Sequence, residues 1–468
     1  MSSSPKMDVS GGPYKTIALV LLIFYIIFVS LSNQYPKCPS APASASFFSP
    51  FLKNQQPTTL DHLVFGLVGS EKAWHHRKAY IESWWRPNAT HGLLFLDTAP
   101  TGDLLPWSAA SPPYRVSDDL TRFLNKSDVV AQRIIHAIME VYREEEHENM
   151  RWLVMGDDDS IFVVDNMLQI LSGYDHTKYY YFGGQSEFIL SNYWYSFSQG
   201  FGGAGFIMSL PLAKLVAADM DKCLLRYRHL NAADKTTMSC IADIGVNLTP
   251  LKGIHQIDMR GDISGFLSSH PKYPLLSLHH FDMVDPIFPN MNRSESTRHL
   301  MKAVAADNSR MLQQTICYHR PTNWSFSISW GYSAHIYEKI LARSHLQFPI
   351  ETFKTWWHPN PRPPHYMFNT RLPSRDPCLA PHMFFYHTVG TTTNDQILTE
   401  FSRAWRRDLP PCSFSGNHSA DSISTIKVYS PATKRFQADR SECCDVVRMD
   451  GEEAEIKFRE CAAQEIIA

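Results

Sequence analysis

Between residues 60 and 289, short apolar runs alternate with amphipathic stretches, and this alternation restricts the fold more than any other feature. Three runs have the length of buried strands: His62–Gly69 (HLVFGLVG), His91–Asp97 (HGLLFLD) and Arg151–Met155 (RWLVM). Segments 72–85 and 129–146 carry apolar residues at helical spacing. Strands that alternate with helices predict an α/β fold around a mixed, mainly parallel sheet, with ligands bound near the carboxyl ends of the strands.

Three adjacent carboxylates, Asp157, Asp158 and Asp159, follow the third run directly, and the apolar residues SIFVV come soon after them. Adjacent carboxylates repel one another, so a fold that places them at a strand end needs a positive partner. A hard divalent cation prefers oxygen ligands and leaves coordination positions for substrate phosphates. A solvated acidic turn is the alternative, but such a turn is rarely embedded between apolar runs. The triplet therefore predicts a site for a cation, which would screen the negative charge of a nucleotide diphosphate.

Two later motifs are compatible with the same site, and each also has a purely structural interpretation. The segment Gly200–Gly205 (GFGGAG) either lets backbone approach a ligand or forms a tight packing turn. It lacks the spacing of a phosphate loop. His279 and His280 lie near Asp282 and Asp285, where an imidazole either completes the coordination of a cation or belongs to a hydrogen-bonded structural pair. Together the three clusters predict a binding site for a donor substrate that carries a nucleotide diphosphate.

The N-terminal part contains one apolar run without charge, Ile17–Leu31. Extended to residues 16–34, it has about the length that crosses a thin secretory membrane. The lysines before it predict a cytosolic tail over residues 1–15. A cleaved signal peptide is the competing interpretation. Residues 35–59 are rich in Pro, Ser and Ala and predict a flexible stem, so we expect a single transmembrane helix, a stem and a luminal head.

Cysteines and glycosylation triplets also predict a luminal head. Eight cysteines after the stem permit disulfides in an oxidising compartment, with no pairing readable from the sequence: Cys223, Cys240, Cys317, Cys378, Cys412, Cys443, Cys444 and Cys461. Six Asn-x-Ser/Thr triplets begin at Asn88, Asn125, Asn247, Asn292, Asn323 and Asn417. With 44 Lys and Arg against 46 Asp and Glu, the chain lacks a basic excess, so we expect no nucleic-acid partner.

The order of the motifs WLVMGDDDSIF, GGAGFIMS, IHQIDMRGD and HPKYPLLSLHHFDMVDPIFP resembles that of the plant fringe-related glycosyltransferases, within the Fringe β-1,3-glycosyltransferase group. The resemblance covers about residues 60–441. It implies a GT-A-type nucleotide-sugar-binding domain over residues 60–289 and a β-rich addition over residues 290–468. It also implies a single-pass type II protein of the Golgi membrane with its catalytic head in the lumen.

The implied reaction is the inverting transfer of a sugar from a UDP-sugar, of the galactose or N-acetylglucosamine type, to a hydroxyl of a glycan or glycoprotein. A β-1,3 linkage is expected. The implied cofactor is Mn²⁺, with Mg²⁺ as the alternative.

The same resemblance assigns roles to individual residues. Asp159 would bind the metal, with His280 as the second protein ligand. The residues expected to contact or border the donor are Arg77, Lys78, Asp157, Asp158, Gly202, Gly203, Ala204 and Gly205. An inverting enzyme needs a carboxylate that takes the proton of the acceptor hydroxyl. Asp234 is the expected base and Asp243 the alternative; Lys235 stands where the family has a second Asp.

The C-terminal part is rich in aromatic residues. Five of them either stack on sugar rings of an acceptor or, in the simpler interpretation, mostly pack in a core: Trp324, Trp330, Tyr332, Trp356 and Trp357. Three classes of function are compatible with the whole chain. The first is the metal-dependent transferase, the second a catalytically inactive glycan-binding or scaffolding protein of the same fold, motivated by Lys235, and the third a single-pass receptor. The intact Asp triplet and His280 favour the first.

Overall fold

The computed structural model describes residues 20–28, 56–126, 128–145, 148–357, 362–415, 418–435 and 440–467. The chain divides into two compact units, Met1–Lys53 and Asn54–Ala468. In the first unit, residues 20–28 form a helix with exposed side chains. Within the described ranges, no helix combines the length and apolar character that a membrane crossing requires. The rest of the predicted segment 16–34, the tail over residues 1–15 and nearly all of the stem lie outside the described residues.

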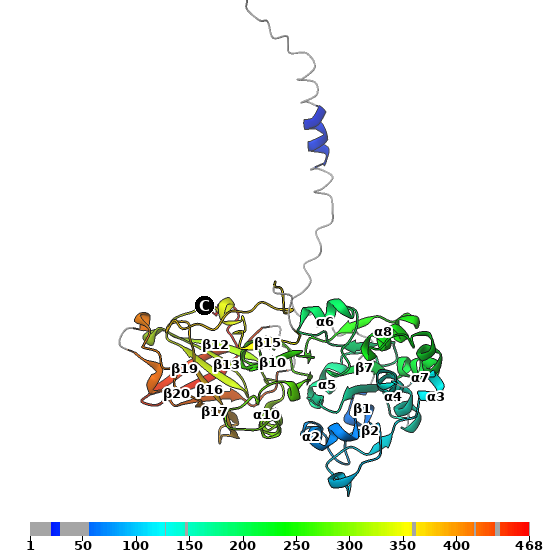
Figure 1. The fold of residues 1–468 in the computed structure, drawn as a ribbon. Helices are drawn as coiled ribbons and strands as arrows, with labels where there is room; N and C mark the ends of the chain where they lie inside the picture. The colour runs from blue at the N-terminus through cyan, green and yellow to red at the C-terminus, as the bar shows by residue number, and fades with distance from the viewer. Residues whose placement is uncertain are drawn as a thin grey trace, which may run out of the picture. The chain divides into compact units, whose positions relative to one another are not determined.

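The second unit contains a seven-stranded sheet that includes the strands predicted from the apolar runs (Figure 1). In spatial order the strands are β3 (Tyr114–Val116), β2 (His91–Leu96), β1 (Leu63–Val68), β4 (Trp152–Asp157), β7 (Phe206–Ser209), β6 (Tyr181–Gly183) and β8 (Leu248–Pro250). The first four are parallel, β7 is antiparallel to β4 and β6, and β8 is parallel to β6. This mixed, mainly parallel sheet confirms the α/β prediction.

Apolar side chains cover both faces of this sheet, which is why its central strands are continuous apolar runs. Along β1, Phe65 and Leu67 belong to one buried cluster, whereas Val64 and Val68 belong to the other. The first cluster includes side chains of α2 (Glu71–Glu82) and α5 (Val164–Leu171), and the second includes those of α4 (Val130–Glu144), α7 (Leu210–Arg226) and α8 (Ala233–Asp243). The other α-helices are α3 (Thr121–Leu124), α6 (Ile189–Trp194), α9 (Ser264–Ser269), α10 (Arg293–Asp307) and α11 (Arg343–Leu346).

Two small sheets bring distant segments to the carboxyl end of β4. In one, β11 (Ser277–Leu278) pairs antiparallel with β5 (Ile161–Phe162) and parallel with β9 (Ile254–His255). In the other, β10 (Met259–Gly261) pairs antiparallel with β15 (Phe353–Thr355). Because β5 follows the Asp triplet and β11 precedes the histidine pair, the first sheet places these two motifs side by side.

The C-terminal part is an eight-stranded sheet, which confirms the β-rich prediction. Its strands in spatial order are β12 (Gln314–His319), β13 (Trp324–Ser329), β14 (Ser333–Tyr337), β16 (His382–Thr391), β17 (Gln396–Arg403), β18 (Thr425–Pro431), β20 (Glu453–Arg459) and β19 (Cys443–Asp450). All neighbours are antiparallel except β18 and β20. Trp324, Trp330 and Tyr332 are buried here, in the apolar cluster that also contains Trp152 of β4, so one core extends across residue 290.

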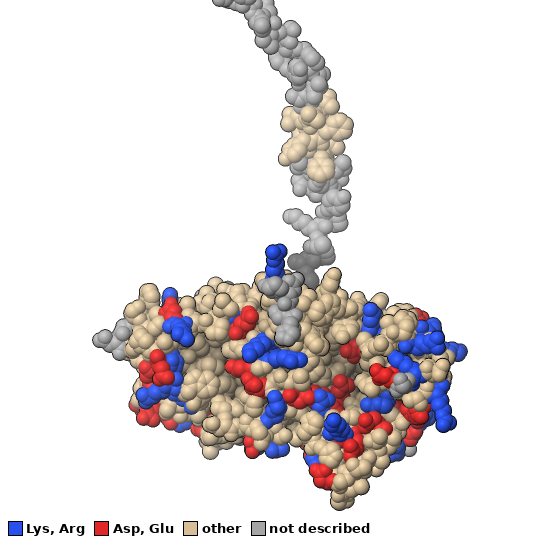
Figure 2. Space-filling view, viewed as in Figure 1, with Lys and Arg blue, Asp and Glu red and all other residues tan. Residues whose placement is uncertain are grey.

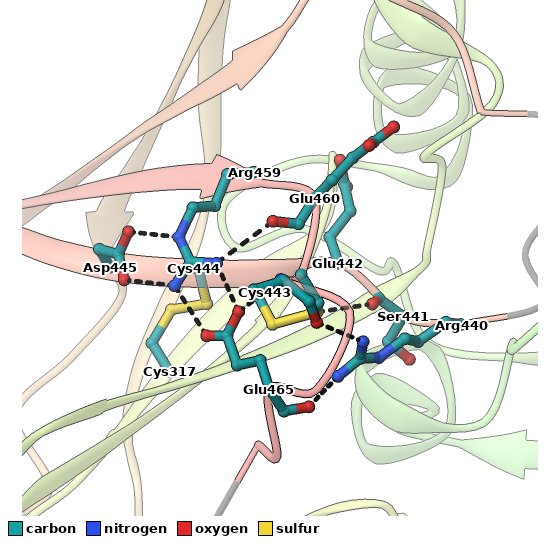
Figure 3. The surroundings of a disulfide bond; sticks show 12 residues. Cys317, Arg440, Ser441, Glu442, Cys443, Cys444, Asp445, Arg459, Glu460 and Glu465 are labelled. Carbon is teal, nitrogen blue, oxygen red and sulfur yellow. Dashed lines mark hydrogen bonds and ion pairs between the residues drawn. A yellow bond between two sulfur atoms is a disulfide. The ribbon is translucent and has the colours of Figure 1, made fainter.

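Four disulfides use all eight cysteines after the stem: Cys223–Cys240, Cys317–Cys444, Cys378–Cys412 and Cys443–Cys461. The adjacent residues Cys443 and Cys444 lie on β19, where successive side chains leave opposite faces and reach different partners. Figure 3 shows Arg459 beside them, paired with Asp445 (2.7 Å) and Glu465 (2.7 Å). Covalent and ionic contacts therefore fix the last strands.

Charged side chains of both signs are interspersed over the face of the second unit that Figure 2 shows. Neither sign of charge forms a large separate patch on this face, in keeping with the near equal numbers of basic and acidic residues in the chain.

Candidate active site

The three adjacent carboxylates lie at the carboxyl edge of the parallel sheet, where sheets of this kind bind ligands. Asp157 is the last residue of β4, and the backbone N–H of Asp158 donates to Val68 O at the end of β1 (3.0 Å). Asp158 and Asp159 are buried, whereas the side chain of Asp157 is one-third exposed. The triplet is therefore not a solvated acidic turn.

The residues that follow β11 place two imidazoles near this edge. His279 Nε2 lies 3.1 Å from Asp159 Oδ1 and 3.8 Å from Asp157 Oδ2. One potential ligand atom from each of these three residues lies within 4.8 Å of the other two, a spacing that suits a metal ion. The family resemblance implies His280 as the second metal ligand, but in the structure His280 Nδ1 lies 2.9 Å from Asp258 Oδ1. His280 has a left-handed backbone (φ 67°), so adjacent rings face different carboxylates.

Arg77, on α2, supplies positive charge to the acidic cluster. Its Nη1 lies 2.7 Å from Asp158 Oδ1 and 3.4 Å from Asp159 Oδ1, and its Nη2 contacts Asp282. Burial alone would lower the pKa of Arg77, but the carboxylates of Asp159, Asp158 and Asp282 raise it. Arg77 therefore remains charged beside them. Lys78, the next residue, is half-buried and makes no ion pair with another described residue.

The protonation states of Asp159 and His279 suit a cation. Burial opposes ionisation of Asp159, yet His279 and Arg77 hold its pKa below the usual range. Burial also lowers the pKa of His279, against the raising effect of Asp159. An ionised carboxylate beside a neutral imidazole is the donor set that a divalent metal requires. Burial, with Asp159 and other carboxylates nearby, raises the pKa of Asp157 well above its ordinary value, because one more negative charge is costly there.

Several buried polar atoms at this edge of the sheet have unused hydrogen-bonding capacity, including Arg77 Nε and Asp282 Oδ1. Asp159 Oδ2 and His279 Nδ1 are buried and have no hydrogen-bond partner among the described residues. Buried polar atoms are nearly always satisfied, so an unsatisfied carboxylate oxygen in an acidic pocket indicates a missing ligand. The donor set of Asp157, Asp159 and His279 therefore fits the implied Mn²⁺ or Mg²⁺.

The segment Gly202–Gly205 forms a turn directly before β7 and packs against the site. Gly205 has φ +90°, and its N–H donates to Gly202 O (2.9 Å). A Cβ on Gly203 would lie only 2.0 Å from Cε1 of His279, so the imidazole ring rests on bare backbone. The missing side chain at Gly203 therefore makes room for the histidine that approaches Asp159.

The two carboxylates predicted as alternative bases lie at opposite ends of α8. Asp234, in the first turn, accepts a hydrogen bond from Gly202 N–H (2.9 Å). Burial raises the pKa of Asp234 to about 6, although the Gly202 N–H lowers it. Asp243, the last helical residue, is exposed and accepts a hydrogen bond from Arg226 Nε (2.9 Å). The structure thus brings Asp234, and not Asp243, next to the glycine turn.

A cavity of about 220 Å³ opens beside Asp234. Its lining combines polar and aromatic side chains, including Asp234, Gln256, Asp258, His280, Tyr195, Phe201, Trp356 and Trp357. Gln256 accepts the N–H of Ala204 (3.0 Å) and donates to Asp258 (3.2 Å), which links the glycine turn to this cavity. Gln256 and Asp258 are not among the site residues predicted from the sequence, although both lie in the motif IHQIDMRGD.

Known proteins match two overlapping parts of the chain. The family described as "Protein of unknown function, DUF604" matches residues 191–444, more than half of the chain, and the family described as "Fringe-like" matches residues 111–265. A mouse (Mus musculus) protein named beta-1,3-glucosyltransferase is 26% identical over 120 residues, which are 26% of this chain and 24% of that protein. The chain thus matches about a quarter of the length of this curated relative. It belongs to the DUF604 family and, through residues 111–265, it is Fringe-related.

Proposed function

We propose that this protein is an inverting, metal-dependent glycosyltransferase that moves a sugar from a UDP-sugar to a hydroxyl of a glycan or glycoprotein. The observation that carries the proposal is the group formed by Asp157, Asp159 and His279, whose ligand atoms lie within 4.8 Å of one another. The Fringe-like match and the mouse relative support the reaction class.

In this proposal Asp157, Asp159 and His279 hold Mn²⁺, or Mg²⁺ as the alternative. The cation, when bound, screens the diphosphate and stabilises the charge that develops on it as the leaving group. Arg77 fixes the carboxylates of Asp158 and Asp159 and adds a positive charge at the same edge of the sheet. His280 pairs with Asp258 and faces the cavity beside Asp234.

Asp234 is the proposed general base. It lines the cavity beside the glycine turn, and its raised pKa of about 6 leaves it mostly ionised at neutral pH while keeping it basic enough to accept a proton. An acceptor hydroxyl in this cavity would give its proton to Asp234 as its oxygen attacks the anomeric carbon. The bond to the diphosphate breaks in the same displacement, which inverts that carbon.

The donor and the linkage are proposed from the family. UDP-galactose and UDP-N-acetylglucosamine are the first candidates, and UDP-glucose joins them because the mouse relative is named a beta-1,3-glucosyltransferase. A β-1,3 linkage follows from the same comparison.

We also propose that residues 16–34 anchor the chain in the Golgi membrane as a single-pass type II protein with its head in the lumen. The uncharged run Ile17–Leu31 and the four disulfides of the second unit support this topology, since disulfides persist in oxidising compartments. Protease protection of the head in intact microsomes and retention in the membrane after alkaline extraction would test it.

UDP release by the purified full chain tests the enzymatic proposal. We expect release with Mn²⁺, one of the three UDP-sugars and a glycan acceptor, and its loss with EDTA. Absent or metal-independent release across a broad acceptor panel would contradict the proposal and favour the glycan-binding alternative that Lys235 motivates.

A further inference from the structure

We propose that the cavity beside Asp234 is the acceptor subsite and that the C-terminal part of the chain completes it, with Trp357 as the surface on which a neutral sugar ring stacks. The inference rests on the proposed function, since it assigns the acceptor class for the same base. Among the described residues that line the cavity, both tryptophans lie after position 350, so the subsite depends on a segment far from the Asp triplet in sequence.

Backbone pairing holds the C-terminal segment against the cavity. Strand β15 pairs with β10, which directly follows Asp258, and Trp356 and Trp357 come immediately after β15. On the far side of these residues, Phe188 forms a β-bridge with Tyr366. The backbone N–H of Ile189 donates to His365 O (3.0 Å), next to α6. The two indoles are therefore carried by a segment that is attached to the catalytic part on both sides.

The two tryptophans differ in what already contacts them. The ring of Trp356 is stacked on His280, with centroids 4.4 Å apart and planes at 17°. The guanidinium of Arg260 also lies over Trp356, 5.0 Å from the ring centroid. Trp357 lines the same cavity and is 53% exposed. Trp356 is thus a positioning residue for His280, and Trp357 is available to a ligand.

The chemistry of the cavity favours a neutral sugar. A sugar ring has an apolar C–H face that packs on an indole and a rim of hydroxyls that donate to carboxylates. Trp357 and Tyr195, which is 43% exposed, offer aromatic surface, and Asp234 offers an acceptor. The carboxylate of Asp234 lines the cavity and repels an acidic sugar. A volume of about 220 Å³ is below the roughly 300–1,000 Å³ of sites for drug-sized ligands, which suits one sugar unit at a time.

Direct sugar binding tests this inference separately from turnover. The full chain, saturated with UDP and Mn²⁺, is titrated with the β-methyl glycosides of galactose, glucose and N-acetylglucosamine, and with that of glucuronic acid as the charged comparison. Saturation-transfer NMR reports binding. We expect at least one neutral glycoside to bind and the glucuronide to bind at least tenfold more weakly.

Two variants locate the contact. Trp357→Ala is expected to weaken binding of the neutral glycoside about tenfold, whereas Trp357→Phe retains part of the stacking and gives an intermediate loss. Trp405→Ala is the matched control, because Trp405 is equally exposed (52%) but does not line the cavity. UDP affinity should be unchanged in all three variants.

Unchanged sugar affinity in both Trp357 variants would overturn the inference, and so would the failure of every neutral glycoside to bind the UDP-loaded chain. A glucuronide that binds as tightly as the neutral sugars would overturn the neutral acceptor class. If the wild-type chain instead fails to bind UDP with Mn²⁺, the proposed function itself falls, and the acceptor assignment falls with it.

Discussion

Two buried clusters in this protein combine carboxylate, imidazole and guanidinium groups, one at the end of β4 and the other in the C-terminal sheet. In the C-terminal cluster, Glu338 Oε1 contacts His382 Nε2 (2.9 Å) and accepts Ala420 N–H (2.8 Å). Its Oε2 accepts Cys412 N–H (2.7 Å) and pairs with Arg407 (3.0 Å). At the end of β4, by contrast, Asp159 Oδ2 has no hydrogen-bond partner among the described residues.

The electrostatics differ in the same way. Burial would raise the pKa of Glu338, but the hydrogen bonds from His382 and two backbone N–H groups lower it to about 2, so the charge is well satisfied. At the end of β4, burial raises the pKa of Asp158 to about 6 despite Arg77, and it raises that of Asp157 even more strongly. Residue types alone do not separate a structural charge cluster from a ligand site. Both oxygens of Glu338 are bonded, whereas Asp159 Oδ2 is not, and this difference supports the cation that we propose at the end of β4.

The largest effect is expected at Asp159. Asp159→Ala removes a carboxylate from the cation site and should lower UDP release at least 10³-fold, because stabilisation of the leaving diphosphate is lost. The variant should stay folded with a melting temperature a few degrees lower, because the favourable contacts of ionised Asp159 with His279 and Arg77 are lost. Steady-state UDP release and thermal unfolding measure the two quantities. Wild-type activity in this variant would remove Asp159 from the site.

Asp234→Asn separates binding from transfer within the same site. We expect transfer to fall about 10²–10⁴-fold, the range for loss of a general base, while affinity for UDP with Mn²⁺ is unchanged. Calorimetric titration of UDP and single-turnover transfer measure these quantities. Full transfer by the variant would mean that another group takes the proton, although Asp243 lies on the surface beside Arg226.

Glu338→Gln is the reciprocal test in the C-terminal sheet. Losing the buried charge should lower the free energy of unfolding by about 3 kcal/mol and leave UDP affinity unchanged. Because the folded pKa is about 2 and the reference value is 4.5, this stabilisation is present above pH 4.5 and disappears as the pH falls toward 2. Denaturant unfolding of both proteins across this range should show the difference shrinking. A variant as stable as wild type at pH 7 would contradict the structural role of this cluster.

The two adjacent histidines sharpen the choice of metal ligand. His279→Gln should weaken Mn²⁺ binding about 10–100-fold, whereas His280→Gln should change it less, because His280 faces Asp258. Mn²⁺ titration of the two variants side by side distinguishes them. The opposite order would restore His280 as the ligand expected from the sequence.

The smallest expected effect is the change in transfer rate with pH. Asp234 must be ionised to act as a base, and its pKa is about 6, so transfer should rise with pH through 6 and change less than twofold above pH 7. Between pH 7 and pH 5 we expect a loss of about tenfold, and this acidic limb should be absent from the residual activity of Asp234→Asn. A flat wild-type profile between pH 5 and pH 7 would argue against this assignment.

Much of the fold was predictable because buried parallel strands are continuous apolar runs of distinctive length. The segments 62–69, 91–97 and 151–155 each contain a strand of the main sheet, and 72–85 and 129–146 each contain a helix. The position of the Asp triplet followed from the third strand. These features depend on local pattern, which a single sequence displays.

Other features depend on tertiary contacts that no local pattern encodes. Which of two adjacent histidines faces Asp159 is decided by the left-handed backbone at His280. The different partners of Cys443 and Cys444 depend on the pairing of distant strands. The sequence does not distinguish Trp357 from the buried tryptophans of the same region. The pairing of β15 with β10 brings Trp357 to the cavity.

Electron paramagnetic resonance of Mn²⁺ shows whether the carboxylates at the end of β4 hold a metal ion. We expect the wild-type chain with UDP to bind Mn²⁺ at one site, Asp159→Ala to lose this site while remaining folded, and folded Glu338→Gln to retain it. Equal Mn²⁺ binding by the wild type and by Asp159→Ala would contradict a metal site at Asp159.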